Sequence, residues 1–339
     1  MDQLPIRKTR PINSGELGKA HDGPRRLTVF VRRARSIDPD RAKAKSLRSH
    51  DVPTIGGDED DFCRGRVEEV GRELIDLLLQ KDEKVVAVTR NPSAATLPHG
   101  VRLVTGDPSS PATLTSALRG VKAVFLNPVS VGNATADLLS LMAQQGVGRV
   151  VLLSALTVQY GGGERRFADQ FKAHEEAVKS SGLQWTLLRC SDFAANTLAW
   201  APQIRSTGVV RGAFGDAATS PIHERDIAAV GACALLQREH AGCSYVLTGP
   251  QSLSQRDKIH LIGEAIGKQL LWEEISPEQV RRDMLAQGLP ADVPDRMLGY
   301  LADHVKRPGP SSVAVERILG RPALTFAQWA IDHAAAFRN

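Results

Sequence analysis

Two charged side chains stand just after short apolar runs that are typical of strands. Arg90 follows the continuous apolar run at 85–88, and Asp107 follows a second run at 101–105. Such runs suit strands that are buried on both faces of a parallel sheet. A parallel sheet binds ligands beyond the carboxyl ends of its strands. There, a guanidinium can hold a phosphate through two hydrogen bonds, whereas Asp107 could face a ligand or cap the following turn.

The elements that would position these side chains alternate regularly from Arg66 onward. The sequence predicts strands at 85–88, 101–105, 123–126, 149–153, 185–189 and 244–248 and helices at 74–79, 111–118, 134–145, 165–181 and 224–236. Strands that alternate with helices in this way predict an α/β fold with a Rossmann-like, doubly wound parallel sheet. We expect this domain to span residues 62–248.

After residue 248 the pattern becomes mainly helical. Residues 249–339 predict helices at 255–266, 277–287, 292–304, 313–319 and 326–337, with one strand near 270–275. Earlier in the chain, helix 193–204 and an extended segment at 209–214 also depart from the strand-helix alternation. We expect residues 249–339 to form a smaller cap over the strand ends, where a substrate would bind.

The N-terminal residues differ in charge from the remainder of the 339-residue chain. Residues 1–50 hold 13 Lys and Arg against 5 Asp and Glu, a balance of +8, so the whole-chain charge of +5 leaves −3 for the rest. We expect residues 1–61 to form a basic, disordered leader, although the apolar island 27–31 could form a strand. Because the body is not basic, we expect it to bind no nucleic acid.

The four cysteines and the hydropathy pattern place the protein in the cytoplasm. Cys63, Cys190, Cys233 and Cys243 lack the spacing of a disulfide framework or a zinc site, and the histidines add no metal-binding spacing. No apolar run approaches the ~18 residues of a membrane span. We therefore expect reduced thiols, no metal and no membrane association; the oligomeric state stays open.

Nine segments between about residues 65 and 339 carry a family resemblance. They are VGRELIDLLL, VVAVTRNP, VRLVTGD, AVFLNPV, GVGRVVLLSA, KAHEEAVKSSGLQWTLLR, SPIHERDIAAV, YVLTGPQSLS and GRPALTFAQWAIDHAAAF. In this order and spacing they resemble the NmrA-like branch of the atypical short-chain dehydrogenases/reductases. This resemblance implies an NAD(P)-binding Rossmann domain. It also implies an NAD(P)H-dependent oxidoreductase with a small-molecule substrate, which would be a quinone, an azo compound or a similar carbonyl-type acceptor. A cofactor-binding redox sensor without turnover, or a scaffold that no longer binds cofactor, is the alternative.

The resemblance assigns roles to particular residues. It implies a cofactor site formed by Gly65, Gly71, Thr89, Arg90, Gly106, Asp107, Asn127, Pro128 and Ser154, with Lys172 catalytic and with Phe193 and Asn196 lining the substrate cleft. Arg90 stands where a base would hold the 2′-phosphate, so NADP is favoured over NAD. Asn127 could instead be a strand-exit residue, and Phe193 could instead pack in the core.

The glycine-rich loop departs from the family pattern GxxGxxG. Gly65 and Gly71 match its first and third glycines, but Glu68 occupies the middle position and brings a negative charge to the expected pyrophosphate site. No buried strand precedes this segment. The island at 27–31 could supply that strand through a long loop. A shifted reading frame upstream of about Val70 would also account for these residues.

The catalytic pattern of the superfamily is incomplete as well. A Tyr-x-x-x-Lys pair and a serine normally act together, with the lysine lowering the pKa of the tyrosine that transfers the proton. Lys172 and Ser154 fit two of these positions, but Ala168 stands where the tyrosine would be. Tyr160, in a glycine-rich segment, could substitute for it, although we expect no tyrosine-lysine relay.

Overall fold

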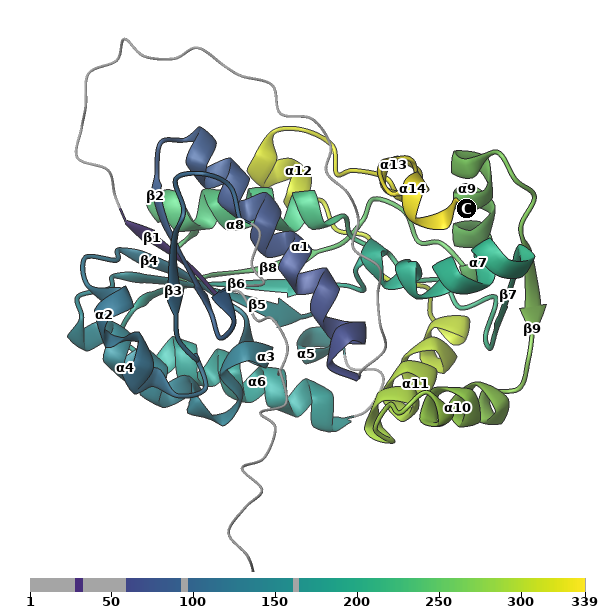
Figure 1. Ribbon diagram of the computed structural model, residues 1–339, viewed down its shortest axis with the longest axis horizontal. Helices are drawn as coiled ribbons and strands as arrows, with labels where there is room; N and C mark the ends of the chain where they lie inside the picture. The colour runs from purple at the N-terminus through teal and green to yellow at the C-terminus, as the bar shows by residue number, and fades with distance from the viewer. Residues whose placement is uncertain (1–27, 33–58, 93–96, 161–164, 339) are drawn as a thin grey trace, which may run out of the picture.

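A seven-stranded sheet forms the centre of the computed structural model, which describes residues 28–32, 59–92, 97–160 and 165–338 (Figure 1). The strand order is β3-β2-β1-β4-β5-β6-β8. The strands are β1 Thr28–Arg32, β2 Lys84–Thr89, β3 Arg102–Thr105, β4 Ala123–Leu126, β5 Arg149–Ala155, β6 Gln184–Cys190 and β8 Cys243–Leu247. All neighbouring pairs that do not include β1 are parallel, so the Rossmann-like α/β prediction is confirmed.

The central strand β1 comes from the segment that the charge pattern assigned to a disordered leader. It pairs antiparallel with both neighbours: Val29 lies opposite Ala87 of β2 and Phe125 of β4. Val29 and Phe30 are fully buried and belong to the cores on opposite faces of the sheet. The leader prediction is therefore wrong for residues 28–32, and the alternative that this apolar island supplies a strand is confirmed. Residues 1–27 and 33–58 lie outside the described part of the chain.

Helices cover both faces of the sheet (Figure 1). One face carries α1 Glu59–Gln80, α8 Glu224–Leu236 and α12 Ala314–Leu319, whose core residues include Leu74, Leu78, Ile227 and Val315. The other face carries η2 Pro111–Leu114, α2 Thr115–Leu118, α4 Thr135–Gln144 and α6 Arg165–Ser180, with Leu118, Leu138 and Val178 in its core. Because helices bury both faces, the strands read as continuous apolar runs rather than alternating ones.

A second, smaller core lies beyond the strand ends. It contains the parallel pair β7 Val209–Gly212 and β9 Leu271–Glu274. Around this pair lie η4 Ala194–Trp200, α7 Ala201–Thr207, α9 Gln255–Ile266, α10 Pro277–Ala286, α11 Asp292–Lys306, α13 Phe326–Asp332 and α14 Ala334–Phe337. Trp329 is fully buried in this core. The small region therefore draws on residues from both sides of position 248, while α12 returns to pack on α8.

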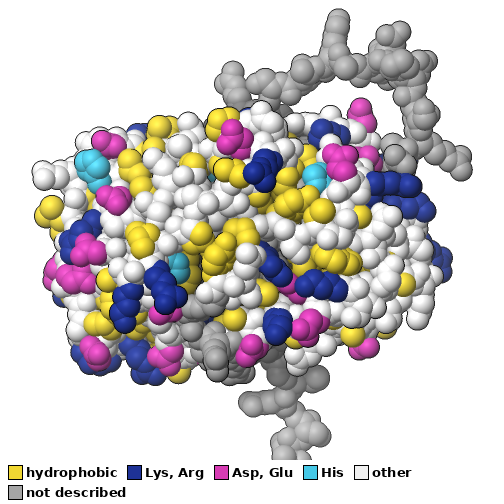
Figure 2. Space-filling model, turned by 180° about the vertical axis from the view of Figure 1, so that it is seen from behind, with side chains coloured by type: hydrophobic (Ala, Val, Ile, Leu, Met, Phe, Trp, Pro, Cys, Tyr) yellow, Lys and Arg dark blue, Asp and Glu magenta, His cyan; other side chains and the backbone are white. Residues whose placement is uncertain are grey.

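On the face seen in Figure 2, acidic and basic side chains are interspersed. Among the helices described, none combines the length and the apolar character needed to cross a membrane. Cys190, Cys233 and Cys243 are free thiols.

Candidate functional site

The fold brings most of the predicted site residues to one edge of the sheet. Thr89 and Arg90 stand at the end of β2, Gly106 and Asp107 beyond β3, Asn127 beyond β4, Ser154 near the end of β5 and Phe193 beyond β6. Since all strands of this sheet except β1 run parallel, these residues share the carboxyl edge, where doubly wound sheets bind ligands. β1 runs the other way, so its carboxyl end at Arg32 lies opposite Lys84, at the other edge of the sheet.

Arg90 and Asp107 lie together at this edge. The Arg90 guanidinium is 4.0 Å from Asp107 Oδ2, and the two side chains are 32% and 28% exposed. Asp107 Oδ1 accepts hydrogen bonds from the backbone N (2.9 Å) and the Oγ (2.7 Å) of Ser109. Asp107 therefore caps the turn after β3, as one of the two interpretations of this residue predicted. It also holds the partly exposed guanidinium of Arg90 at the strand end.

Gly106 joins this turn tightly to β2. Its backbone N donates to the Thr89 carbonyl at 3.0 Å. A Cβ atom on Gly106 would come 2.5 Å from Cδ2 of Leu114 and 3.3 Å from Val88. A larger residue here would force the Leu114 side chain of η2 to shift, so glycine suits the close packing of η2 against the strand end. Thr89 is buried, and its Oγ1 accepts from the backbone N of Asn91 at 3.2 Å, which shapes the turn that carries Arg90.

Asn127 and Pro128 begin a short helix, α3 (Pro128–Val131), at the end of β4. Asn127 is 6% exposed, and its Oδ1 accepts from the backbone N of Val129 at 3.1 Å as the N-cap. Pro128 occupies the first turn, where its missing N–H costs nothing. The strand-exit interpretation of Asn127 is thus confirmed, and its contact with a cofactor ribose remains a prediction.

Ser154 belongs to a buried ion-pair network. Its Oγ donates to Glu175 Oε1 at 2.6 Å, and Arg189 donates to both oxygens of the same carboxylate, at 2.9 and 2.7 Å. Burial would raise the pKa of Glu175, but the hydrogen bonds from Arg189 and Ser154 and the charges of Arg189 and Lys179 lower it below its ordinary value. The Ser154 hydroxyl therefore uses its single proton in the hydrogen bond to Glu175.

The sequence interpretation missed this network, although its members were visible. Glu175 lies one turn after Lys172 on α6, and Arg189 is paired with Ser154 across β5 and β6. The contacts of Glu175 with Arg189 and Ser154 form only when the chain folds. The sequence shows only where these residues stand in the segments KAHEEAVKSSGLQWTLLR and VVLLSA.

Lys172 and Tyr160 are both placed at the surface. Lys172 is exposed on α6, and Ala168 lies on the preceding turn. Tyr160 ends the short helix α5 (Thr157–Tyr160) with its side chain 56% exposed. The described residues around Ser154 thus contain no tyrosine hydrogen-bonded to Lys172 or Ser154, and a proton relay of the usual kind stays predicted to be absent.

Replacing Tyr160 by phenylalanine should therefore leave any reductase activity within a few-fold of the parent. The phenol is exposed, and nothing in the network of Ser154 depends on it. Steady-state kcat and kcat/KM for both proteins check this expectation. A fall of the order of 10²–10⁴, typical of the loss of a general acid-base group, would show that Tyr160 transfers a proton.

The predicted substrate residues lie where the small region begins. Phe193 pairs with Ile222 through an isolated bridge and packs against the core of the sheet, which favours its packing interpretation. Asn196 is half-buried in η4. From the small region, Arg296 of α11 places its guanidinium 4.5 Å from the ring centre of Phe167 on α6. Helix α11 thus reaches the helix that carries Lys172 and Glu175.

A second buried network lies beside these residues and was not predicted. Asp192 Oδ2 accepts from Thr219 Oγ1 at 2.8 Å and from Lys258 Nζ at 3.3 Å, and Lys258 is only 2% exposed. Burial and then the negative charge of Asp192 raise the pKa of Tyr300, on α11, well above its usual value. Asp192 therefore ties the end of β6 to α9 and α11.

The expected glycine-rich turn is not formed. Gly65, Glu68 and Gly71 all lie inside α1, which runs without a break from Glu59 to Gln80. The residues before Gly71 include good helix formers, and one interior glycine costs only about 1 kcal/mol. The prediction that these glycines form a loop is wrong; the side chain of Glu68 lies outside the described part, and any contact of Gly65 and Gly71 with a cofactor remains a prediction.

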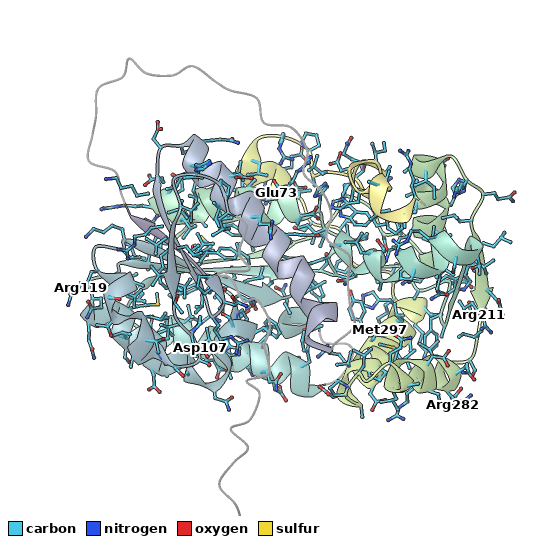
Figure 3. All side chains as sticks on the ribbon, viewed as in Figure 1. Glu73, Asp107, Arg119, Arg211, Arg282 and Met297 are labelled. Atoms are coloured by element: carbon cyan, nitrogen blue, oxygen red, sulfur yellow. The ribbon has the colours of Figure 1, made fainter. Side chains whose placement is uncertain are left out.

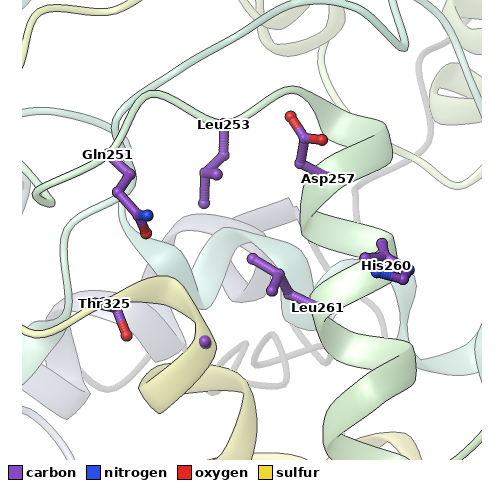
Figure 4. A pocket seen from close by; sticks show the side chains of 7 residues that line it. Gln251, Leu253, Asp257, His260, Leu261 and Thr325 are labelled. Atoms are coloured by element: carbon purple, nitrogen blue, oxygen red, sulfur yellow. The ribbon is translucent and has the colours of Figure 1, made fainter.

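A pocket of about 350 Å³ lies elsewhere, between α9 and α13 (Figure 4). It is lined by Gln251, Leu253, Asp257, His260, Leu261, Thr325 and Ala327. Asp257 is already bound in the capping box of α9 with Ser254, and His260 pairs with Glu264 at 3.4 Å. None of the predicted site residues lines this pocket, so we do not assign the cofactor to it.

Comparison with known proteins identifies the family of this chain. A family of proteins described as NAD(P)H-binding matches residues 69–238. The chain belongs to this family. The resemblance to NmrA-like atypical short-chain dehydrogenases/reductases is confirmed as well. The match begins at Glu69, after Gly65 and Glu68, so only the last position of the glycine pattern falls within it.

Two relatives named as reductases and one solved structure of an oxidoreductase match this chain over most of their length. The chain is 33% identical over 273 residues to the (4-alkanoyl-5-oxo-2,5-dihydrofuran-3-yl)methyl phosphate reductase of Streptomyces griseus, covering 79% of this chain and 95% of that protein. It is 32% identical over 281 residues to an NAD(P)H azoreductase of Xenophilus azovorans, covering 79% and 96%. The NADPH complex of the quinone oxidoreductase QOR2 from Escherichia coli superposes with a TM-score of 0.66 at 25% identity, covering 78% and 96%.

Proposed function

We propose that this protein is an NADPH-dependent reductase of a small, electron-poor acceptor of the quinone, azo or conjugated-carbonyl type. The observation that supports this most is the group of Arg90, Asp107, Asn127 and Ser154 at one edge of the sheet in an NAD(P)H-binding chain. Relatives named as an azoreductase and a quinone oxidoreductase support the acceptor class.

Arg90 is the residue that would favour NADPH over NADH. Its guanidinium is partly exposed at the end of β2, and its ion pair with Asp107 is long, at 4.0 Å. A 2′-phosphate could replace Asp107 as a closer, bidentate partner. The described residues thus fit the adenosine end of the cofactor, whereas no glycine-rich turn in the same part of the chain fits the pyrophosphate.

The lack of a strong general acid near Ser154 supports this class of acceptor. The bound cofactor would supply a hydride. Quinone and azo acceptors spread the resulting negative charge over a conjugated system, so they need less help from a general acid than a simple ketone does. The Ser154 hydroxyl donates its hydrogen bond to Glu175, and Ala168 stands in place of the usual tyrosine, so the described residues around Ser154 offer no strong general acid.

Steady-state oxidation of NADPH in the presence of a quinone, an azo dye and a simple aliphatic ketone tests the proposal. We expect turnover with the quinone or the azo dye and little or none with the ketone. Turnover of the ketone at a comparable kcat/KM would contradict the acceptor class.

A second candidate function is a cofactor-binding redox sensor that does not turn over. The exposed Lys172 and the missing tyrosine favour it over an ordinary dehydrogenase. Saturable NADPH binding without oxidation by any acceptor in the panel would select the sensor and overturn the reductase.

A further inference from the structure

Three side chains that are far apart in the sequence converge where α1, the start of α8 and the end of α13 meet. Glu69, Glu224 and His333 each offer one ligand atom, and these atoms lie within 4.8 Å of one another. Glu224 Oε1 and His333 Nε2 are 3.2 Å apart. No sequence spacing could reveal this group, because each residue comes from a different helix or helix end.

The His333 ring is oriented as a metal ligand would be. Its Nδ1 lies 2.9 Å from the Trp329 carbonyl oxygen, which can only accept, so Nδ1 carries a proton. In the neutral ring, Nε2 then presents a lone pair to the Glu224 carboxylate. Two lone pairs at 3.2 Å repel, so a positive charge must lie between them, either a proton or a metal ion. Metal-binding histidines commonly donate their other N–H to a backbone carbonyl in this way.

The facing carboxylate is also held in place. Glu224 is 3% exposed, and its Oε2 accepts from Trp329 Nε1 at 3.1 Å, which leaves Oε1 toward His333. Neighbouring His223 accepts the Arg225 backbone N at its Nδ1 and faces Asp332 with Nε2. Arg225 binds Asp332 at 2.8 Å and Glu73 (Figure 3) at 3.6 Å. Glu73 lies one turn along α1 from Glu69. The Arg225 guanidinium therefore already pairs with two carboxylates, those of Asp332 and Glu73.

We infer that Glu69, Glu224 and His333 form a binding site for a divalent transition-metal ion of the Zn²⁺ type. A tetrahedral Zn²⁺ with bonds of about 2.0–2.2 Å separates its ligand atoms by roughly 3.3–3.6 Å, close to the His333–Glu224 distance. One imidazole and two carboxylates suit Zn²⁺ better than Mg²⁺ or Ca²⁺, which prefer oxygen alone. The ion would join the first helix and α8 to the C-terminal segment.

Calorimetric titration of the full, chelator-treated chain with zinc chloride tests this site. We expect saturable binding of one ion per chain. His333→Gln and Glu69→Gln should each weaken binding by about tenfold or more, since even second-shell changes cost 10–100-fold.

His260→Gln is the matched control, because His260 also pairs with a glutamate, Glu264, but is 75% exposed on α9. It should leave binding unchanged. Circular dichroism and thermal melting establish that each variant is folded, and Glu69→Gln serves if His333→Gln does not fold. Absence of saturable Zn²⁺ binding by the parent, or unchanged affinity in a folded His333→Gln or Glu69→Gln variant, would overturn the site.

Discussion

Arg90→Ala should weaken NADPH binding by about 10- to 100-fold and NADH binding by a few-fold at most. A hydrogen-bonded contact to a charged group contributes about 1.5–3 kcal/mol, and each 1.4 kcal/mol is a factor of ten in affinity. Only NADPH carries the 2′-phosphate that the guanidinium at the end of β2 would hold. Dissociation constants for both cofactors, measured by fluorescence or calorimetry, give the two ratios directly.

Arg119→Ala is the control for a general change in charge. Arg119 is exposed on the same Rossmann body, and it lies well away from Asp107 (Figure 3). It should leave both dissociation constants within about twofold, as expected for an exposed charge whose long-range effect is screened by salt. Equal losses of NADPH and NADH affinity in Arg90→Ala would instead remove Arg90 from the 2′-phosphate site.

The largest effect on stability should come from Arg189→Ala. This change would leave the Glu175 carboxylate, 1% exposed, without its main positive partner. Breaking a buried ion pair from one side costs about 3–5 kcal/mol. The free energy of unfolding in urea at neutral pH should fall by about that amount, and the melting temperature should fall with it.

The loss of unfolding free energy in Arg189→Ala should depend on pH. Because the pKa of Glu175 is lowered in the folded state, its stabilising contribution is present above the ordinary value of 4.5 and is lost as the pH falls through the folded value. The difference between the parent and Arg189→Ala should therefore shrink below about pH 4.5. A difference that stays constant from neutral to acidic pH would show that lost packing, not charge, is responsible.

Arg211→Ala provides the matched surface comparison. Arg211 and Glu273 form an ion pair of 3.1 Å, but both side chains are about half exposed, at 55% and 51%. Exposed pairs contribute about 0–1 kcal/mol. We expect its unfolding free energy to stay within about 1 kcal/mol of the parent.

The elements themselves could be predicted because their signals are local. The continuous apolar runs at β2, β4 and β5 report burial on both faces, and glycines at the helix ends mark where helices stop. The direction of β1 could not be predicted in the same way. Val29 and Phe30 fill opposite cores, and a strand buried on both faces reads alike whether it runs parallel or antiparallel.

The position of the site could be predicted from the sequence, but the hydrogen bonds and ion pairs between its side chains could not. Parallel strands alone bring Arg90 and Asp107 to one edge, so their neighbourhood followed from the pattern. The bonds from Ser154 and Arg189 to Glu175, and the contact of Asp192 with Lys258, depend on side chains that meet only in the folded protein. The prediction of a glycine-rich turn was wrong because residues with high helix propensity continue α1 through Gly65. The family pattern assumes a strand directly before the turn.

Calorimetric titration of the unmodified full chain with NADPH, and in parallel with NADH, tests the proposed function most directly. We expect saturable binding of one NADPH per chain and weaker binding of NADH. The antiparallel β1 and the unbroken α1 make this a demanding test, because the described part of the chain lacks the usual pyrophosphate turn. Absence of binding heat with either cofactor at about 1 mM, where even a weak site of about −4 kcal/mol would be half filled, would contradict the reductase and the sensor alike.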